Sequence, residues 1–164
     1  MTRLAAEQCG GRNVAAFMDM LAFAEGTDNG RQKTNDHGYD VQVGGNLLTD
    51  YATHPREPVY LPRYGITSTA AGRYQFTAHT WDEMAARLAL PDFGPVSQDR
   101  ACVQLLRRCG AYPLIRAGQF DDAVHMARKT WASLPGAGYG QREQRIEALR
   151  VVYRRAGGVI GRPA

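Results

Sequence analysis

Apolar residues recur at helical spacing between residues 13 and 25, the first long periodic stretch of the chain. They fall at positions i, i+3, i+4 and i+7 and are Val14, Phe17, Met18 and Leu21. Asn13 can cap the start of this helix, and Gly26 supplies the stop that commonly follows a helix end. The pattern therefore predicts an amphipathic helix over 13–25.

Alternating apolar and polar residues follow this helix and favour a strand pair. The stretch "YDVQV" (39–43) alternates, "GGN" can turn, and "LLTDY" (47–51) can return, so the sequence predicts an antiparallel hairpin over 39–51. Residues 52–72 contain three prolines and two glycines with little periodicity. They predict a long, partly extended loop.

Helical patterns fill the rest of the chain. The predicted segments are a helix at 80–90 with Thr80 and Glu83 as a capping box, a helix from Ser97 to Gly110, a short turn from Pro113 to Gly118, a helix from Phe120 to Trp131, and a last helix over 141–156. The glycine-rich stretch "SLPGAGYG" (133–140) separates the last two helices.

This order of elements indicates an α+β fold, in which a mostly helical lobe and a small antiparallel β-hairpin lobe flank a cleft. A chain of 164 residues is long enough for one domain with a hydrophobic core, so we expect a single domain over 1–164.

The formal net charge of +4, with eighteen arginines among twenty basic residues, favours an anionic partner. The alternative is a solvated surface with a bias toward arginine. Five arginines fall on the predicted last helix, but no aromatic residues are interleaved with them and no nucleic-acid-binding motif is present, so we expect no nucleic acid partner.

Three cysteines cannot all pair within one chain, and we expect free, buried thiols. Cys102 and Cys109 are seven positions apart on one helix, roughly 10 Å along its axis, whereas a disulfide requires Cα atoms about 4.4–6.8 Å apart.

No apolar run is long enough to span a bilayer. Asp19 interrupts "VAAFMDMLAFA", the one candidate for the apolar core of a secretion signal, so we expect synthesis in the cytoplasm without a signal peptide.

A carboxylate falls on the apolar stripe of the first helix. Glu25 lies four residues after Leu21 and seven after Met18, one position before the glycine stop. Partial burial and the negative end of the helix dipole would both raise its pKa. A carboxylic acid that keeps its proton near neutral pH can protonate a departing glycosidic oxygen. The alternative is a glutamate at the boundary of the core, with its stem packed and its carboxylate in water.

Four aspartates follow Glu25 and are candidates for a second catalytic carboxylate: Asp28, Asp36, Asp40 and Asp50. A retaining glycosidase needs its second carboxylate at about 5–5.5 Å and an inverting one at about 6.5–9.5 Å. Aspartates also cap turns, as "TDNG" suggests here.

Two further stretches could contact a sugar. Tyr139, among the glycines of "SLPGAGYG", would present an aromatic face on a flap, although the stretch could equally be a simple connection between helices. In "AAGRYQF", Tyr74 and Gln75 follow a glycine turn. The histidines lack metal-ligand spacing, and no CxxC, Walker or GxSxG motif occurs, so no metal or cofactor is expected.

Several of these stretches together resemble one known family. The matching segments are "FMDMLAFAEGTDNGRQKTNDHGYDVQVGG" (17–45), "TDYATHPR" (49–56), "AAGRYQ" (70–75), "SQD" (97–99) and "WASLPGAGYGQ" (131–141). In these segments the chain resembles the bacteriophage endolysins with lytic transglycosylase activity. Residues 1–12 do not match and form an atypical extension, and the loop at 57–67 differs.

The resemblance implies a lysozyme-like fold, with lips at about 56–68 and 133–144 over a sugar groove. It places the family's catalytic glutamate on Glu25 and its saccharide contacts on Asp40, Gln75 and Tyr139. The implied reaction cleaves peptidoglycan between N-acetylmuramic acid and N-acetylglucosamine and forms a 1,6-anhydro end without water. The resemblance also implies that the partner of the chain is the glycan strand. It implies that the chain works as a monomer and acts on the periplasmic wall after the membrane is permeabilised.

Two other functions remain open at this stage. A hydrolytic lysozyme would use Glu25 with one of the nearby aspartates, and a wall-binding module without catalysis would use Glu25 only structurally.

Overall fold

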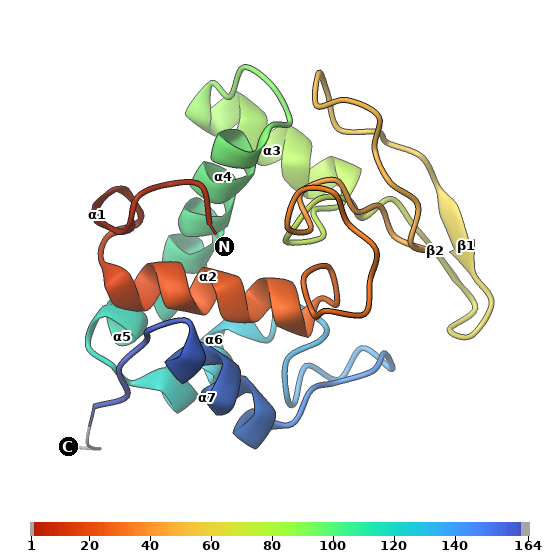
Figure 1. The fold of residues 1–164 in the computed structure, drawn as a ribbon. Helices are drawn as coiled ribbons and strands as arrows, with labels where there is room; N and C mark the ends of the chain where they lie inside the picture. The colour runs from red at the N-terminus through yellow and green to blue at the C-terminus, as the bar shows by residue number, and fades with distance from the viewer. Residues whose placement is uncertain (1, 162–164) are drawn as a thin grey trace.

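The computed structural model describes residues 2–161, which contain seven helices and one two-stranded sheet (Figure 1). The helices are α1 (Ala6–Cys9), α2 (Arg12–Ala24), α3 (Ala78–Leu88), α4 (Pro95–Arg108), α5 (Ala111–Arg116), α6 (Phe120–Ala127) and α7 (Ile146–Arg155). The strands are β1 (Val59–Leu61) and β2 (Ile66–Ser68). This is the predicted α+β class, mostly helical with a small antiparallel sheet.

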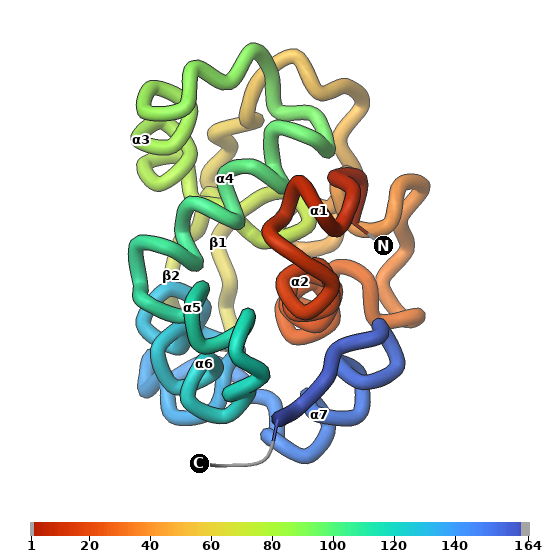
Figure 2. Tube along the Cα trace, turned by 90° about the vertical axis from the view of Figure 1, so that its left-hand side faces the viewer, coloured from red at the N-terminus to blue at the C-terminus, as the bar shows by residue number. Residues whose placement is uncertain are grey.

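Helix α2 is the centre of the helical part. Figure 2 looks nearly along its axis, with α1 and α4 on one side and α5, α6 and α7 on the other. The four predicted apolar positions are fully buried, but so are Ala16 and Met20 on other faces, so α2 is a core helix rather than an amphipathic one. Phe17 packs edge-on against Phe120 and Tyr153, at ring-centroid distances of 5.9 and 6.3 Å.

The sheet lies in a different place from the predicted hairpin. β1 and β2 pair with Tyr60 opposite Thr67, inside the segment 52–72 that was predicted to be a loop. The predicted hairpin at 39–51 forms as an antiparallel chain reversal with an isolated bridge between Val41 and Leu47, but not as two named strands; a second isolated bridge joins Gln42 to Ala71. Residues 39–42 are all buried, so their alternation does not reflect a strand with one wet face.

Three predicted helix starts are also wrong. Gly11 precedes α2, and the side chain of Asn13 instead donates to the Ile115 carbonyl. Thr77 caps α3 by accepting from the Thr80 N–H, so Thr80 is not the cap. For α4 the cap is Gly94, followed by Pro95 at the first helical position.

Three further predicted features of the helical region need correction. Glu83 is not part of a capping box and pairs with Arg108. Ser97 lies inside α4, where its hydroxyl donates to Asp92. The helix from Phe120 stops at Ala127 and the last helix starts at Ile146, both shorter than predicted.

A buried carboxylate joins four distant parts of the fold. Asp99 on α4 is fully buried and accepts hydrogen bonds from the hydroxyls of Tyr39 and Tyr74 at 2.8 and 2.6 Å. Its other oxygen accepts from the backbone N–H groups of Arg3 and Leu4 at 2.7 and 2.9 Å. Arg3 and Leu4, in the N-terminal segment that does not match the endolysin family, are thereby tied to the core.

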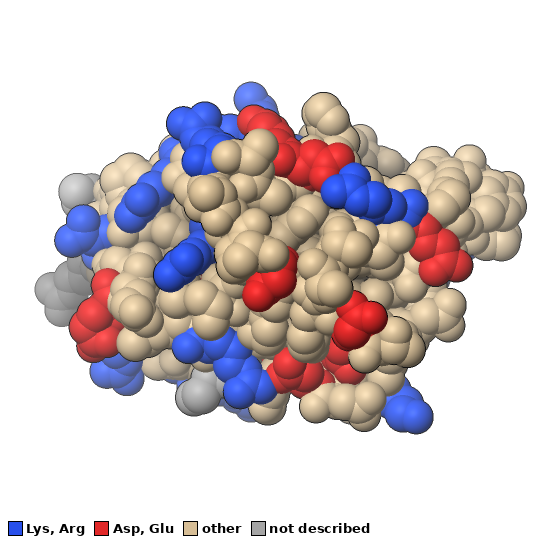
Figure 3. All heavy atoms as spheres, turned by 90° about the horizontal axis from the view of Figure 1, so that it is seen from above, with Lys and Arg blue, Asp and Glu red and all other residues tan. Residues whose placement is uncertain are grey.

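The surface mixes both charges rather than presenting one sign. On the face shown in Figure 3, basic and acidic side chains lie among one another. Several arginines are paired with carboxylates, as in Arg56 with Asp82 and Arg150 with Asp121. In the described part of the chain five arginines are compensated locally in this way, which leaves the net charge of +4 unchanged.

All three cysteines are free thiols, as predicted; Cys9 and Cys102 are buried and Cys109 is partly exposed. None of the helices described between residues 2 and 161 combines the length and apolar character needed to cross a bilayer.

Candidate active site

Glu25 ends helix α2. It is the residue that follows the last helical position, and its N–H donates to the Leu21 carbonyl at 2.8 Å. Gly26 then adopts a φ of +79°, a left-handed conformation that glycine tolerates and that turns the chain away from the helix. The stop predicted at Gly26 is confirmed, and it leaves the Glu25 side chain at the end of a rigid core helix.

The loop between α6 and α7 provides the partner of Glu25. The hydroxyl of Ser133, a nearly buried residue, donates to Glu25 Oε1 at 2.5 Å. Ser133 also accepts from the Gln144 N–H at 2.8 Å, and the Gln144 side chain donates to the Ala24 carbonyl at 3.5 Å. Both ends of the loop 133–144 are therefore fastened to the C-terminal end of α2.

The surroundings raise the pKa of Glu25 to about 7. Burial is the main cause, because a charged carboxylate loses hydration where protein surrounds it. Hydrogen bonds from the hydroxyl and backbone of Ser133 oppose the shift without cancelling it. Part of the residue keeps solvent-accessible surface, so protons can still be exchanged. Near neutral pH this group is present both as the acid and as the carboxylate.

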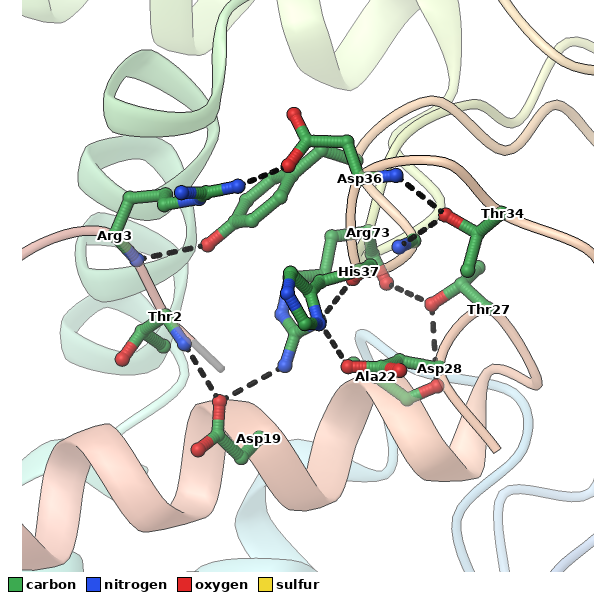
Figure 4. A network of polar contacts seen from close by, with 12 residues as sticks. Thr2, Arg3, Asp19, Ala22, Thr27, Asp28, Thr34, Asp36, His37 and Arg73 are labelled. Atoms are coloured by element: carbon green, nitrogen blue, oxygen red, sulfur yellow. Dashed lines mark hydrogen bonds and ion pairs between the residues drawn. The ribbon is translucent and has the colours of Figure 1, made fainter. Parts of the chain in front are cut away.

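Asp28, the nearest of the four candidate aspartates along the chain, belongs to a network around Arg73 (Figure 4). The guanidinium of Arg73 is 1% exposed and contacts Asp28 at 2.7 Å and Asp19 at 2.8 Å, and it also donates to the His37 carbonyl. Burial works to raise the pKa of Asp28, but the hydrogen bond and charge of Arg73 outweigh it and hold that pKa below its usual value.

The other candidate aspartates also have structural partners. Asp36 accepts from the Tyr51 hydroxyl at 2.8 Å and pairs with Arg3. Asp50 is exposed and accepts from a backbone N–H two residues on, a typical turn contact. Each carboxylate therefore already has a structural partner.

Asp40 is 4% exposed, and its two carboxylate oxygens accept from the Thr34 hydroxyl and the Asn35 N–H. It closes the 34–40 loop. The carbonyl of Asp40 accepts from the Leu48 N–H at 2.7 Å, so the same residue also holds the chain reversal around Gly44.

Gln75 lies at a sharp turn, with a φ of +53°. Its amide nitrogen donates to the carbonyls of Gly72 and Val41 at 2.9 and 3.2 Å. No described residue donates to its amide oxygen, so this oxygen can accept from a ligand. Tyr74, by contrast, is fully buried and bound to Asp99, which removes it from the candidate sugar contacts.

Tyr139 is 57% exposed on the loop 133–144. Its hydroxyl donates to the Lys129 carbonyl at 2.8 Å, which orients the ring while leaving its face in solvent. The loop is ordered by Glu143, whose carboxylate accepts from the N–H groups of Gly136 and Gly138. In Figure 1 this loop and the β1–β2 arm both extend to the side of the molecule toward which the C-terminal end of α2 points.

Sequence reasoning did not find Ser133 as the partner of Glu25. The two residues are 108 positions apart, and a serine in a glycine-rich connection carries no local signal of this contact. Among residues 2–161, no group of histidine, cysteine and acidic side chains could hold a metal ion. The chemistry that this arrangement supports is proton transfer by one carboxyl group.

Comparisons with known proteins agree with this geometry. A family model described as Endolysin matches residues 15–160. The chain is 51% identical to the endolysin of Escherichia phage lambda over 146 residues, which covers 88% of this chain and 91% of that protein. It is 50% identical over 157 residues to the endolysin of Escherichia phage P2, covering 90% and 94%.

Solved structures give the same result. Bacteriophage lambda lysozyme complexed with a chitohexasaccharide superimposes with a TM-score of 0.87 at 46% identity, covering 98% of this chain and all of that one. A second structure of lysozyme from bacteriophage lambda gives a TM-score of 0.85 at 45% identity, with the same coverage. The described fold is therefore lysozyme-like.

Proposed function

Because the chain belongs to the endolysin family of phage enzymes that lyse the cell wall, we propose that it is a lytic transglycosylase. Its substrate would be the β-1,4 bond between N-acetylmuramic acid and N-acetylglucosamine in peptidoglycan. The observation that carries the proposal is a single carboxyl group, Glu25, with a pKa of about 7 at the end of a core helix.

In the first step the Glu25 carboxyl group donates its proton to the glycosidic oxygen. The bond between that oxygen and C1 of the muramoyl residue breaks, and positive charge develops at C1. A pKa near 7 supports this role, because efficient general acids have a pKa close to the working pH. The acetamido group of the substrate itself would stabilise the charge at C1.

In the second step the Glu25 carboxylate accepts the proton of the muramoyl 6-hydroxyl. That oxygen attacks C1 and closes a 1,6-anhydro ring, so Glu25 regains its proton and no water is consumed. Ser133 would act as a positioning residue, because its hydroxyl can donate to the carboxylate while the other oxygen faces the substrate.

We propose that the glycan strand lies between the lips at about 56–68 and 133–144. Tyr139 would stack on a sugar ring, and the free amide oxygen of Gln75 would accept from a sugar amide or hydroxyl. Asp40 would contribute mainly by holding the 34–40 loop, because its carboxylate already accepts two hydrogen bonds. The chitohexasaccharide in the lambda lysozyme structure supports a glycan ligand.

A hydrolytic lysozyme would need a second carboxylate free to act as nucleophile or base. The partners of Asp28, Asp36 and Asp40 argue against this alternative, because each carboxylate would have to leave hydrogen bonds that hold its loop.

We further propose that the protein is made in the host cytoplasm, works as a monomer on the periplasmic wall after membrane permeabilisation, and binds neither nucleic acid nor a cofactor.

Digestion of peptidoglycan in heavy-oxygen water tests the reaction. Intramolecular attack should outcompete water through its high effective concentration. Mass spectrometry should therefore show unlabelled muramic ends, each lighter by one water than a lysozyme product. Labelled reducing ends would establish the hydrolase, and an absence of new ends with folded enzyme would establish a silent binding module.

A further inference from the structure

A pocket lies outside the candidate active site. It has a volume of about 330 Å³ and opens between the ends of α4 and α6. Arg108 and Cys109 form one wall, and five residues between positions 125 and 130 form the rest. None of the steps proposed for Glu25 uses this pocket.

The pocket adjoins the loop that carries Tyr139. The Lys129 carbonyl, which accepts from the Tyr139 hydroxyl, belongs to a residue that lines the pocket. A Cβ atom placed on Gly136 of the same loop would lie 3.7 Å from Nη1 of Arg128. The back of this proposed sugar-binding lip is thus continuous with the pocket wall.

Positive charge dominates the lining. Arg108 is paired with Glu83 at 2.7 Å, but no carboxylate in the described structure forms an ion pair with Arg128 or Lys129. Glu143 on the neighbouring loop is occupied by two backbone N–H groups. Two cations at the pocket are therefore left without an acidic partner, and they favour an anion there.

The hydrogen bond at His125 also favours an anion in the pocket. Arg128 can only donate, so the Nδ1 atom of His125 accepts from it and the neutral ring carries its proton on Nε2. The ring therefore adds an outward donor. Cys109 and Met126 could bind a soft metal ion, but the surrounding cations disfavour one.

The rest of the lining is apolar enough to select an anion on an aliphatic chain. Met126 is 41% exposed, and Cys109 and Thr130 are partly exposed beside it. A bare inorganic anion would gain nothing from these side chains, whereas a peptide carboxylate would bury methylene groups against them.

We propose that this pocket binds a free carboxylate of the peptide borne by the glycan strand. The proposal rests on the proposed function, because a strand held by the Tyr139 lip would bring its peptides next to the pocket. Arg128 and Lys129 would hold the carboxylate, and Met126 would pack on the aliphatic part of the peptide.

Cys109 offers a direct reporter, because Cys9 and Cys102 are fully buried. The rate of Cys109 alkylation by iodoacetamide would be titrated with three probes: the wall tripeptide L-alanyl-γ-D-glutamyl-diaminopimelic acid, the same peptide with every carboxylate amidated, and inorganic phosphate. The acidic peptide should protect Cys109, and the other two should not. Equal protection by the amidated peptide or by phosphate would overturn the proposal.

The double variant Arg128→Gln/Lys129→Gln should weaken this protection about tenfold or more, since charge-assisted hydrogen bonds are lost. The matched control, Arg154→Gln/Arg155→Gln on α7, removes the same charge and should leave the protection unchanged. Equal Kd values of the acidic peptide for the double variant and the wild type would contradict the proposed site.

Cleavage assays separate this proposal from the proposed function. On wall strands that carry peptides the double variant should show a higher KM with a similar kcat, and on strands stripped of peptides by an amidase it should match the wild type. An equal change on both substrates would overturn the peptide site. If the wild type cleaves neither kind of strand, the proposed function is wrong. The Cys109 titration would still show whether the pocket binds the peptide carboxylate.

Discussion

Glu25 and Asp99 are two carboxyl groups withdrawn from bulk water in very different surroundings. Asp99 accepts four hydrogen bonds, from two tyrosine hydroxyls and two backbone N–H groups. Glu25 has one neighbouring residue, Ser133, as its donor, and its pKa rises to about 7. Protein surrounds both carboxyl groups, but the number of hydrogen-bond donors around them differs.

The difference shows how one fold uses the same functional group in two ways. With four donors the charge of a buried carboxylate is compensated, so the group can connect distant segments. With hydrogen bonds from a single residue, Ser133, the lost hydration of a charged Glu25 is not fully offset, so the protonated form is favoured. A half-buried acid with too few donors is therefore a better candidate for catalysis than a fully bonded one.

The largest effect should come from removing the proton at the poorly bonded site. Glu25→Gln keeps the shape of the side chain but has no transferable proton, so wall lysis should fall by about a hundredfold to ten-thousandfold. A turbidity assay on exposed cell walls measures this, and circular dichroism checks the fold. Residual activity above about a hundredth of the wild type would contradict the assignment.

Removing the well-bonded carboxylate should act on stability instead. Asp99→Ala leaves three buried donors, the Leu4 N–H and the hydroxyls of Tyr39 and Tyr74, without this acceptor and should lower the free energy of unfolding by about 3 kcal/mol. Urea unfolding followed by circular dichroism measures the loss. Asp50→Ala, at an exposed turn, is the matched control and should cost about 1 kcal/mol or less. A similar loss in both variants would show that the Asp99 network is not specially stabilising.

The raised pKa of Glu25 predicts a stability that depends on pH with a definite sign. Between its ordinary value of 4.5 and about 7, the folded protein holds a proton that the unfolded chain releases. Wild-type stability should therefore decrease as pH rises through this window. Allowing for the partial exposure of Glu25, the stability gained by Glu25→Gln should be about 1–2 kcal/mol larger near pH 8 than near pH 4. A gain independent of pH would show that Glu25 titrates normally.

The smallest effect should come from changing the number of donors at Glu25. Ser133→Ala removes a hydrogen bond that lowers the pKa of Glu25, so that pKa should rise and the alkaline limb of the pH–activity profile should move to higher pH. Activity at neutral pH should change by less than about tenfold. Ser133→Thr, which keeps the hydroxyl, should retain the wild-type profile; an unmoved profile in Ser133→Ala would remove Ser133 from the role of a positioning residue.

Local signals were enough for the helix that carries Glu25. The apolar spacing and Gly26 placed its end within one residue, because helix ends depend on nearby backbone geometry. The predicted strands were misplaced because the alternation of apolar and polar residues at 39–43 was interpreted as a strand with one solvent-exposed face. Residues 39–42 alternate in polarity yet are wholly buried, with Asp40 bonded inside the 34–40 loop and Gln42 bonded to Glu57.

The setting of the candidate site could not be predicted from local pattern. Ser133 reaches Glu25 across 108 positions, and the buried Arg73 contacts Asp19 and Asp28 across 54 and 45 positions. Such contacts depend on packing, which spacing and composition do not encode locally. Local pattern singled out Glu25, Gln75 and Tyr139 as candidates, and the resemblance to endolysins added the sugar contact at Asp40; the roles of all four remain predictions.

The ties of Arg3 and Leu4 to Asp99 also order events during translation. These residues are 96 and 95 positions from their acceptor, so they cannot dock until Asp99 has been synthesised. At about 5–20 residues per second, the N-terminal segment waits roughly 5–20 s for its acceptor. Ser133 follows later on the ribosome, so the nascent chain acquires the group that tunes Glu25 only after every part of the Asp99 network has been made.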